Sequence, residues 1–417
     1  MDNLQKNKIL VCAFACIRDP DTRFGSGKGG ESGLGWNMIL QIEKFADVFV
    51  LTEAGNKQAI EEKIAEEKIF GINFYYVSLP KFFDFTKNII QIYAYLWQIK
   101  AYFMAKKLQK ENNFDAFWHI TYANDWMASF IGALLPVAYF RGPGGGAHKV
   151  PQAFAKKYSI RQKMAERIRS IGQWFFRHDP FFVIGQNKAK AILICNNEAF
   201  DALPAKWQKK AFYFPVNGIS KKELNILPKK KDDGGKFKIL SAGKLLKIKG
   251  FDLAIKSFAK FAKEKNDVEL NIIGDGPEFL NLKNIAEELK IVEKIKFEKW
   301  MPRDNLLQEM ANADVFLFCS LRDGGGQVVA EAMAAAKPVV CFDIAGPGFH
   351  IDESCGIKIK PSSPEQAIDD FADSFEKLYK DRGLRNKLGK NARKKIEEKY
   401  DWDKLGERVQ KIYKEKI

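Results

Sequence analysis

The chain has 417 residues, 46% of them hydrophobic, and this length and composition are typical of two folded domains rather than a disordered chain. The longest apolar stretch, 127–140, is too short to span a bilayer and contains Pro136. The sequence begins without a signal-peptide pattern, so we expect a cytoplasmic protein. The net charge of +16 points to nucleic acid, an anionic membrane surface or an anionic substrate, unless the excess lysines only solvate the surface.

The cysteines and histidines show no spacing that is typical of a metal site. The four histidines lie far apart in the sequence, and no two cysteines form a Cys-x-x-Cys pair. We therefore expect no bound metal, and reduced thiols inside the core. The six cysteines concerned are Cys12, Cys16, Cys195, Cys319, Cys341 and Cys355.

Short apolar segments alternate with amphipathic ones in the first half of the chain. This alternation predicts parallel sheets with helices on both faces. The segments expected as helices include 36–45 and 88–108. Strands are expected at 8–16, 48–51, 74–77, 115–119 and 181–184.

A stretch rich in turn residues and lysines, 215–236, interrupts this pattern and is interpreted as an interdomain linker. The alternation then resumes. We predict an α/β protein with two Rossmann-like domains that face each other across a cleft, 1–215 and 216–400, and a last segment, 401–417, that crosses back to the first domain. The elements expected after the linker are strands at 237–241, 268–273, 315–319 and 338–342 and helices at 251–262 and 403–414.

The most informative motif is the segment 314–342, which contains the strands expected at 315–319 and 338–342 and the residues between them. Gly324, Gly325 and Gly326 follow a buried strand and precede a helix, so backbone N–H groups at the start of the helix can bind an anion such as a diphosphate. Glu331 lies about a turn and a half into that helix, where its carboxylate can accept hydrogen bonds from hydroxyls. The alternative is a tight turn in which the glycines serve packing alone.

Seven residues separate Asp323 from Glu331, and Ala-Met-Ala and Pro-Val-Val follow. This arrangement resembles the signature of retaining glycosyltransferase family 4, which has the GT-B fold and the motif Glu, seven residues, Glu. The resemblance implies that Asp323 lies beside the donor sugar and that Glu331 holds the ribose, with Gln327 also in the donor site. The chain departs from the family pattern in having Asp at the first position.

Further motifs resemble the same family. Lys249 and Lys244 would neutralise the departing diphosphate, although Lys244 stands where the family usually has Arg. His119 is expected at the end of its strand, close to the donor sugar, or else as a structural histidine. The resemblance also assigns two loops to donor binding, one with Gly29 and Gly30 and one with Gly274, Gly276, Pro277 and Glu278. It assigns to the acceptor side Arg141, Gly144, Gly145, Gly146 and His148.

The resemblance covers nearly the whole chain and implies a hexosyltransferase. It would move a sugar from a UDP- or GDP-linked donor to a hydroxyl of a glycan or lipid-linked glycan, with retention of configuration and without a cofactor or metal. The alternatives are a sugar-nucleotide epimerase with the GT-B fold, and a non-catalytic protein that binds nucleotide sugars or membrane surfaces. Product analysis separates the two enzymes, because free nucleoside diphosphate marks transfer and an altered sugar nucleotide marks epimerisation.

Two basic segments with interleaved aromatic residues, 81–110 and 156–177, lie in the first half of the chain. This pattern is typical of helices that bind anionic lipid, and it predicts a peripheral protein on the inner face of the membrane. The alternative is that the aromatic residues are buried and the lysines solvated. No nucleic-acid-binding motif is present, so nucleic acid is not expected as a partner.

Overall fold

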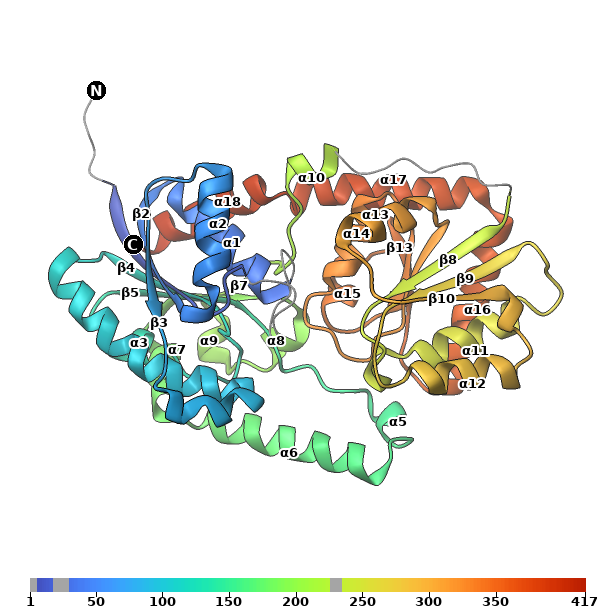
Figure 1. Ribbon diagram of the computed structural model, residues 1–417, viewed down its shortest axis with the longest axis horizontal. Coiled ribbons are helices and arrows are strands. Elements are labelled where there is room, and N and C mark those ends of the chain that lie inside the picture. Colours follow the sequence, from blue (N-terminus) through green and yellow to red (C-terminus); the bar gives the residue numbers. More distant parts are fainter. Residues whose placement is uncertain (1–5, 18–29, 226–234) are drawn as a thin grey trace. The chain divides into compact units, whose positions relative to one another are not determined.

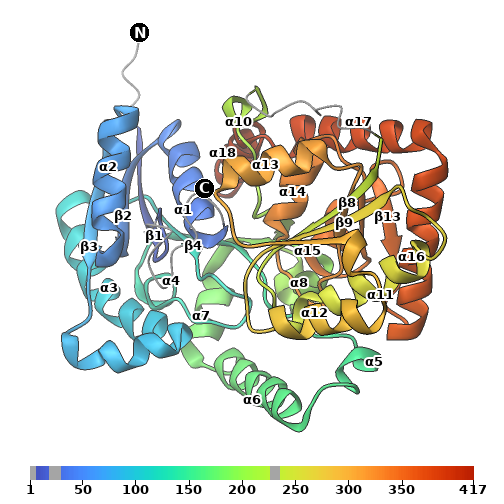
Figure 2. The same ribbon diagram turned by 45° about the vertical axis from the view of Figure 1, so that its right-hand side comes forward.

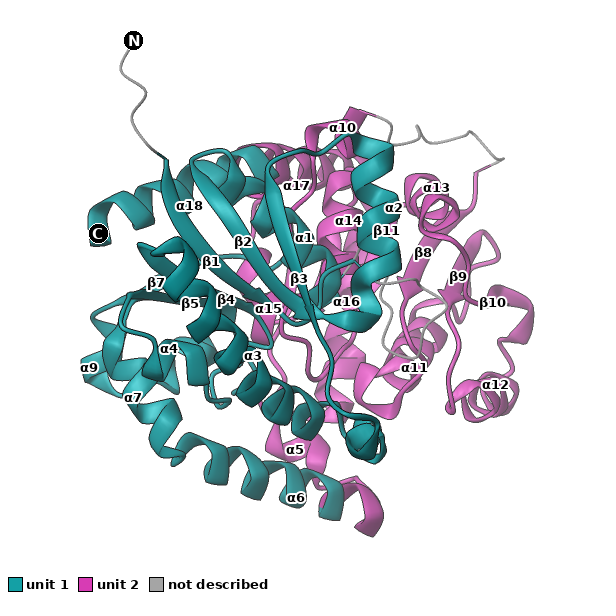
Figure 3. Ribbon diagram, turned by 60° about the vertical axis from the view of Figure 1, so that its left-hand side comes forward, with its two compact units in different colours: residues 1–147, 164–217, 402–417 teal, residues 148–163, 218–401 magenta. Residues whose placement is uncertain are grey.

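The computed structural model describes residues 6–17, 30–225 and 235–417. The chain forms two compact units, coloured separately in Figure 3. Unit 1 comprises residues 1–147, 164–217 and 402–417, and unit 2 comprises residues 148–163 and 218–401. The segment 148–163, expected within the first domain, therefore belongs to unit 2.

Unit 1 is built on a seven-stranded parallel sheet with the order β3-β2-β1-β4-β5-β6-β7. Its strands are β1 (Asn7–Ala13), β2 (Ala46–Glu53), β3 (Ile72–Val77), β4 (Ala116–Thr121), β5 (Ala138–Gly144), β6 (Ala189–Ile194) and β7 (Ala211–Tyr213). Its helices are α1 (Gly30–Glu43), η1 (Ala54–Asn56), α2 (Lys57–Glu67), η2 (Lys81–Asn88), α3 (Ile90–Asn112), α4 (Phe130–Leu134), α7 (Pro180–Lys188), α8 (Asn197–Asp201), α9 (Ala205–Gln208) and α18 (Trp402–Lys416). Helix α6 (Ile160–Arg177) begins in unit 2 and continues in unit 1.

Unit 2 is built on a six-stranded parallel sheet with the order β10-β9-β8-β11-β12-β13. The strands are β8 (Phe237–Ala242), β9 (Val268–Ile273), β10 (Ile295–Glu298), β11 (Val315–Phe318), β12 (Val339–Phe342) and β13 (Gly356–Ile359). The helices are α5 (Gln152–Ala155), α10 (Lys221–Asn225), η3 (Lys247–Lys249), α11 (Phe251–Phe261), α12 (Phe279–Glu288), η4 (Val292–Lys294), α13 (Arg303–Asn312), α14 (Gln327–Ala334), α15 (Ala345–His350), α16 (Pro364–Lys380) and α17 (Arg382–Lys399).

Each sheet is covered on both faces, so each unit has two apolar layers. In unit 2, α11, α12 and α16 pack against one face, and α13, α14 and α17 against the other (Figures 1 and 2). In unit 1, α3, α4 and α7 cover one face, and α1 and α18 cover the other. Both sheets thus have the Rossmann-like, doubly wound arrangement of the GT-B fold class, as predicted.

The strand order reverses direction once in each sheet, between β1 and β4 in unit 1 and between β8 and β11 in unit 2. In doubly wound sheets the loops that leave the strands at such a point diverge to opposite faces and leave room for a ligand. The loops after β8 and β11 contain most of the motifs singled out in the sequence. This position defines the candidate site in unit 2.

One predicted strand, 181–184, is wrong. These apolar residues lie in helix α7, and the strand is β6, which follows directly. The Asp179 carboxylate accepts a hydrogen bond from the Phe181 N–H at 2.7 Å, and Pro180 occupies the first turn, so both residues favour the start of a helix. The other predicted strands lie within three residues of observed strands, although 215–236 contains the short helix α10 in its described part. The predicted helices 251–262 and 403–414 agree within two residues, whereas α1 begins six residues before 36 and α3 ends four residues after 108.

Candidate functional site

The loop after β8 lies directly against the end of β11. Gly250 has a φ of 69°, and a Cβ atom at this position would lie 2.2 Å from the carbonyl oxygen of Cys319. The Leu321 N–H donates to the carbonyl oxygen of Ile248 at 2.9 Å. Only glycine fits at position 250, and its presence brings Lys249 next to the loop that follows β11.

Lys249 and Asp323 form an ion pair at this junction. The Lys249 Nζ atom lies 2.5 Å from Asp323 Oδ2 and 5.7 Å from the centre of the Phe318 ring. The other carboxylate oxygen, Oδ1, accepts hydrogen bonds from the N–H groups of Gly325 at 3.3 Å and Gly326 at 2.7 Å. An ammonium and two backbone N–H groups thus converge on one carboxylate. The same donors have the charge and geometry to bind a phosphate group.

Helix α15 packs against the glycine loop that follows Asp323. Gly326, with a φ of 64°, precedes the first residue of α14, Gln327. The Gly346 N–H donates to the carbonyl oxygen of Asp323 at 3.1 Å. A Cβ atom at Gly346 would lie 2.4 Å from the carbonyl oxygen of Gly324, so this close approach also requires glycine. The backbone at residues 323–326 is therefore fixed by packing before any ligand binds.

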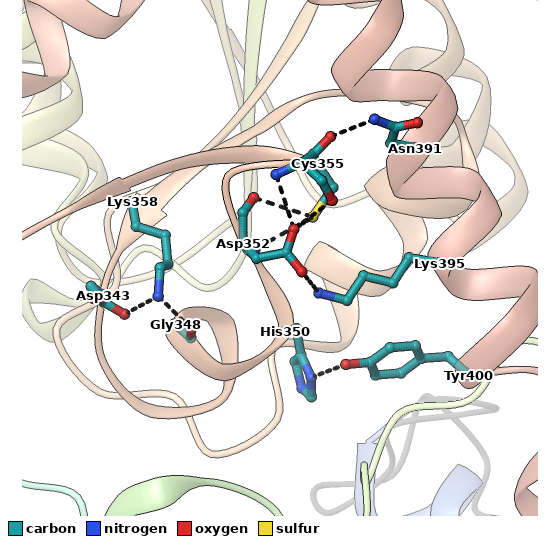
Figure 4. Close-up of polar contacts among 10 residues, drawn as sticks. Asp343, Gly348, His350, Asp352, Cys355, Lys358, Asn391, Lys395 and Tyr400 are labelled. Atoms are coloured by element: carbon teal, nitrogen blue, oxygen red, sulfur yellow. Dashed lines mark hydrogen bonds and ion pairs between the residues drawn. The ribbon is translucent and has the colours of Figure 1, made fainter.

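His350, at the end of α15, is buried, and Figure 4 shows its ring beside the hydroxyl of Tyr400. Its Nε2 atom lies 3.0 Å from the carbonyl oxygen of Gly325, and its Nδ1 atom lies 2.9 Å from the hydroxyl of Tyr400. Because a carbonyl can only accept, Nε2 is protonated and Nδ1 accepts from the hydroxyl. Burial lowers the pKa of His350 to about 4, against the effect of the hydrogen bond to Gly325, so the ring is neutral at pH 7.

Further polar contacts, drawn in Figure 4, connect the turn after α15 to α17. The Asp352 carboxylate binds Lys395 Nζ at 2.5 Å and the Ser354 hydroxyl at 2.5 Å. These contacts outweigh the effect of partial burial and lower the pKa of Asp352 well below its ordinary value. They are structural contacts that stabilise the turn between α15 and β13.

Glu331 is buried in α14, and its main partner is an arginine that the sequence analysis missed. The Nε atom of Arg303 lies 2.7 Å from Glu331 Oε1, and an Nη atom of the same guanidinium lies 2.6 Å from Glu223 Oε1. Burial raises the pKa of Glu331, while Arg303 and Gln327 oppose this rise. Arg303 begins α13 after Pro302, and nothing in that local sequence indicates a partner 28 residues away.

Lys244 is exposed on the loop after β8 and forms no ion pair or hydrogen bond with the described residues through its side chain. The loop with Gly274, Gly276, Pro277 and Glu278 runs beside it. A Cβ atom at Gly274 would lie 1.9 Å from the Gly243 carbonyl oxygen, and the Glu278 N–H donates to the Leu245 carbonyl oxygen at 3.1 Å. The two glycines thus allow the ends of β8 and β9 to come together next to Lys244.

The predicted residues of unit 1 are placed differently from the expectation. His119 does not end its strand, because β4 continues to Thr121, and its side chain is fully buried. Its ring has a weak contact with the Thr121 backbone, but neither ring nitrogen makes a hydrogen bond of normal geometry with a described residue. Burial, and secondarily the charge of Arg141, lower the pKa of His119 to about 3, so this ring is neutral.

Arg141 is buried in β5 and bonds inward to the loop that follows β4. Its guanidinium donates to the carbonyl oxygens of Asn124 and Met127 and lies over the Phe182 ring. Gly144, Gly145 and Gly146 continue this strand end: a Cβ atom at Gly144 would lie 2.1 Å from the Ala123 carbonyl oxygen, and one at Gly145 would lie 2.4 Å from Cys195 Sγ. Arg141 and these glycines thus shape the backbone of unit 1 through close packing.

The remaining predicted residues are His148, Gly30 and Gly29. His148 belongs to unit 2, where its Cε1 atom lies 3.4 Å from the position of a Cβ atom at Gly324. The structure thus brings a residue assigned to the acceptor side next to the glycine loop of unit 2. Gly30 begins α1 with a φ of 59°. Gly29 lies outside the described residues, as does most of the loop that precedes α1.

The basic, aromatic segments contain both buried and exposed rings. Tyr93 and Trp97 are buried in the core of unit 1, whereas Phe82, Phe85 and Phe103 are mostly exposed, as are Trp174 and Phe175. All six cysteines are buried and reduced. Within 6–17, 30–225 and 235–417, no cluster of three metal-binding side chains is found, and no helix has the length and apolarity to cross a membrane.

The part of the chain that contains this site is similar to a family of known proteins. Residues 223–395 match the family described as glycosyl transferases group 1, and this segment, which lies within unit 2, contains Lys249, Arg303, Asp323 and Glu331. An uncharacterized glycosyltransferase of Methanocaldococcus jannaschii is 25% identical over 340 residues, which are 75% of this chain and 80% of that protein. The lipopolysaccharide core biosynthesis glycosyltransferase LpsE of Rhizobium meliloti is 29% identical over 36% of this chain and 42% of its own length.

Solved structures resemble the whole chain in fold. The sucrose-phosphate synthase of Thermosynechococcus elongatus has a TM-score of 0.66 at 14% identity and covers 98% of this chain and 99% of its own. HepE of Anabaena, solved in complex with UDP, has a TM-score of 0.64 at 13% identity, with 98% and 100% covered. Unit 2 is thus similar to group 1 glycosyltransferases, and the chain has the GT-B fold.

Proposed function

We propose that the chain is a retaining hexosyltransferase that moves a sugar from a UDP- or GDP-linked donor to a hydroxyl of a glycan or lipid-linked glycan. The observation that carries this proposal is the convergence of Lys249 and the N–H groups of Gly325 and Gly326 on one point, next to the helix that contains Glu331. These groups can neutralise a diphosphate, and a buried carboxylate can accept from ribose hydroxyls.

In this proposal each side chain of unit 2 has a distinct role. Lys249 and Lys244 stabilise the negative charge that develops on the leaving diphosphate, which is the main electrostatic requirement of the transfer. Glu331, oriented by Arg303, anchors the ribose. When the diphosphate binds the N–H groups of Gly325 and Gly326, the Asp323 side chain loses these partners and rotates toward the donor sugar. His119 of unit 1 is fully buried, so any effect it has on the sugar is indirect, and its pKa of about 3 makes it a neutral group at pH 7.

The proposed reaction keeps the anomeric configuration and uses no bound metal, since lysine and backbone N–H groups supply the positive charge. No side chain of the site is placed as a nucleophile. The oxygen of the leaving phosphate therefore takes the proton of the acceptor hydroxyl on the same face of the sugar. The acceptor side includes His148 and the loop with Arg141 and Gly144–Gly146, and we expect the enzyme to act in the cytoplasm, on the inner surface of the membrane.

Thermal stabilisation by a panel of UDP-, GDP-, ADP- and dTDP-sugars tests the donor site, because a ligand that binds only the folded state raises the melting temperature. We expect one nucleotide to stabilise the protein. With that donor, the release of free nucleoside diphosphate demonstrates transfer or hydrolysis, whereas an altered sugar nucleotide would support an epimerase instead. A protein that binds the donor and turns nothing over, with any acceptor, would be a binding protein.

The matched variants Lys249→Met and Lys247→Met test which group acts on the diphosphate. Lys247 lies two residues away but pairs with Asp252 at 2.7 Å, outside the converging donors. We expect Lys249→Met to lower kcat by about 10²–10³-fold and Lys247→Met to change it little. Equal activity of the two variants would contradict the assignment of Lys249.

A further inference from the structure

Helix α6 presents its apolar residues to solvent. Met164, Ile168, Ile171 and Phe175 are between 55% and 66% exposed, and all four belong to unit 1. Their spacing of four, three and four residues places them in one stripe along the helix. A helix on the surface of a soluble domain normally buries such a stripe, so this orientation is the reverse of the ordinary one.

The opposite face of α6 is the one that packs against unit 1. Gln173 is buried, and its side chain and that of Arg169 both donate to the Gly146 carbonyl oxygen, at 3.0 and 2.9 Å. Phe176 contacts the rings of Tyr95 and Trp126, with centroids 5.4 and 5.7 Å away. These contacts fix the rotation of the helix about its axis. The exposure of the apolar stripe therefore follows from packing on the other side.

Basic residues border the stripe. Arg161, Lys163 and Arg167 are exposed, and none of them forms an ion pair with a described residue. Counted at 100° per residue, Arg161 and Arg167 lie on either side of the stripe. Trp174 is 62% exposed beside it, and its indole ring can occupy the boundary between apolar and polar surroundings. An apolar stripe with basic borders and an aromatic edge matches the layered structure of an anionic membrane surface.

We propose that α6 docks on an anionic lipid surface, with Met164, Ile168, Ile171 and Phe175 inserted among the acyl chains and Arg161, Lys163 and Arg167 against the headgroups. A second copy of this chain fits less well, because a symmetric contact between two α6 helices would bring their basic borders together. The inference deepens the proposed function, since it rests on transfer to a lipid-linked acceptor for its biological purpose. Binding to lipid can nevertheless be measured without donor or acceptor.

Co-sedimentation of the full chain with vesicles tests the docking. The vesicles are of phosphatidylcholine alone, or of phosphatidylcholine with about a third phosphatidylglycerol, over a series of salt concentrations. We expect binding to the anionic vesicles only, weakening as salt rises. The triple variant Ile168→Ser, Ile171→Ser, Phe175→Ser should bind at least about tenfold more weakly. The charge variant Arg161→Gln, Lys163→Gln, Arg167→Gln should lose a similar amount at low salt.

The chain offers matched controls for both variants. Phe70, Leu280 and Trp300 are exposed apolar residues elsewhere, and their replacement by Ser should leave lipid binding unchanged. Lys256, Lys387 and Lys390 are exposed in unit 2 without an ion pair to a described residue, and their replacement by Gln should have little effect. Equal losses in variant and control would overturn the proposal, because they would show a nonspecific effect of charge or apolarity.

Two further outcomes would also overturn the docking proposal. One is that wild type does not bind anionic vesicles even at low salt. The other is that the wild type forms a dimer in solution that the Ser variant of the stripe abolishes, which would identify a second copy as the occupant. Donor-induced thermal stabilisation of the same proteins separates the two proposals. Lipid binding without donor binding contradicts the proposed transferase function. Donor binding without lipid binding contradicts the docking of α6.

Discussion

The Nε2 atom of His350 lies 3.0 Å from the carbonyl oxygen of Gly325, although the two residues are 25 positions apart. This contact joins α15 to the glycine loop whose N–H groups face Asp323. The Gly325 carbonyl shares a planar trans peptide bond with the Gly326 N–H, so a carbonyl that points toward His350 directs this N–H toward Asp323 Oδ1, at 2.7 Å. A histidine that touches no expected ligand atom therefore determines the direction of a donor group in the site.

Two substitutions of His350 separate its contacts. In glutamine the amide nitrogen takes the place of Nε2 and can still donate to Gly325, whereas in asparagine the side chain can replace only the contact of Nδ1 with Tyr400. We expect His350→Asn to weaken donor binding by about fivefold and His350→Gln to retain most of it, because one hydrogen bond contributes about 1 kcal/mol. Isothermal titration with the nucleotide found in the donor panel measures both affinities. Equal affinities would show that the contact with Gly325 does not position the loop.

The pH dependence of stability offers a second test of the buried ring. Burial lowers the pKa of His350 from 6.5 to about 4, so between these values the unfolded chain binds more protons than the folded one. The contribution of this group to stability is therefore fully present above pH 6.5 and is lost as the pH drops toward 4, by about 3 kcal/mol. His350→Gln should lack this part of the decline. Urea unfolding of the wild type and of His350→Gln at pH 7 and pH 4.5 measures how much unfolding free energy each protein loses. The other buried histidine, His119, contributes equally to the loss in both proteins.

Arg303 is expected to be needed for stability as well as for the donor site. Removal of its guanidinium leaves the Glu331 carboxylate buried without its main ionic partner, so Arg303→Met should cost about 3–5 kcal/mol of unfolding free energy. Glu223→Gln keeps the pair with Glu331 and should cost much less. The double variant Arg303→Met, Glu331→Gln should regain part of the loss, because the buried charge is gone. Equal stability of Arg303→Met and Glu223→Gln in urea would contradict this account.

Gly346→Ala tests whether the glycine loop depends on close packing. The new Cβ atom would lie 2.4 Å from the Gly324 carbonyl oxygen and would push the loop away from α15. We expect a loss of about 1–3 kcal/mol of unfolding free energy together with weaker donor binding. Gly172→Ala in α6 is the matched control, since no atom lies within 4 Å of its added Cβ. It should raise stability by about 0.5–1 kcal/mol.

The sequence allowed the strands near the site to be predicted, because β8, β9 and β11 are apolar runs bounded by turn residues. It failed at 181–184, where a run of four apolar residues fits a strand as well as a helix and Asp179 decides for the helix. Arg303 could not be predicted, because its role depends on two carboxylates that are distant in the sequence. The burial of His119 likewise depends on both neighbouring strands of β4.

The last helix has a consequence for the order of folding. Trp402, Leu405, Val409 and Ile412 of α18 are buried in the core layer that α1 covers, so unit 1 is incomplete without them. During synthesis the ribosome makes all of unit 2 before these residues emerge. The first sheet must therefore remain with one face partly uncovered while the second domain folds, and in that interval it is the part of the chain most open to chaperones and to aggregation.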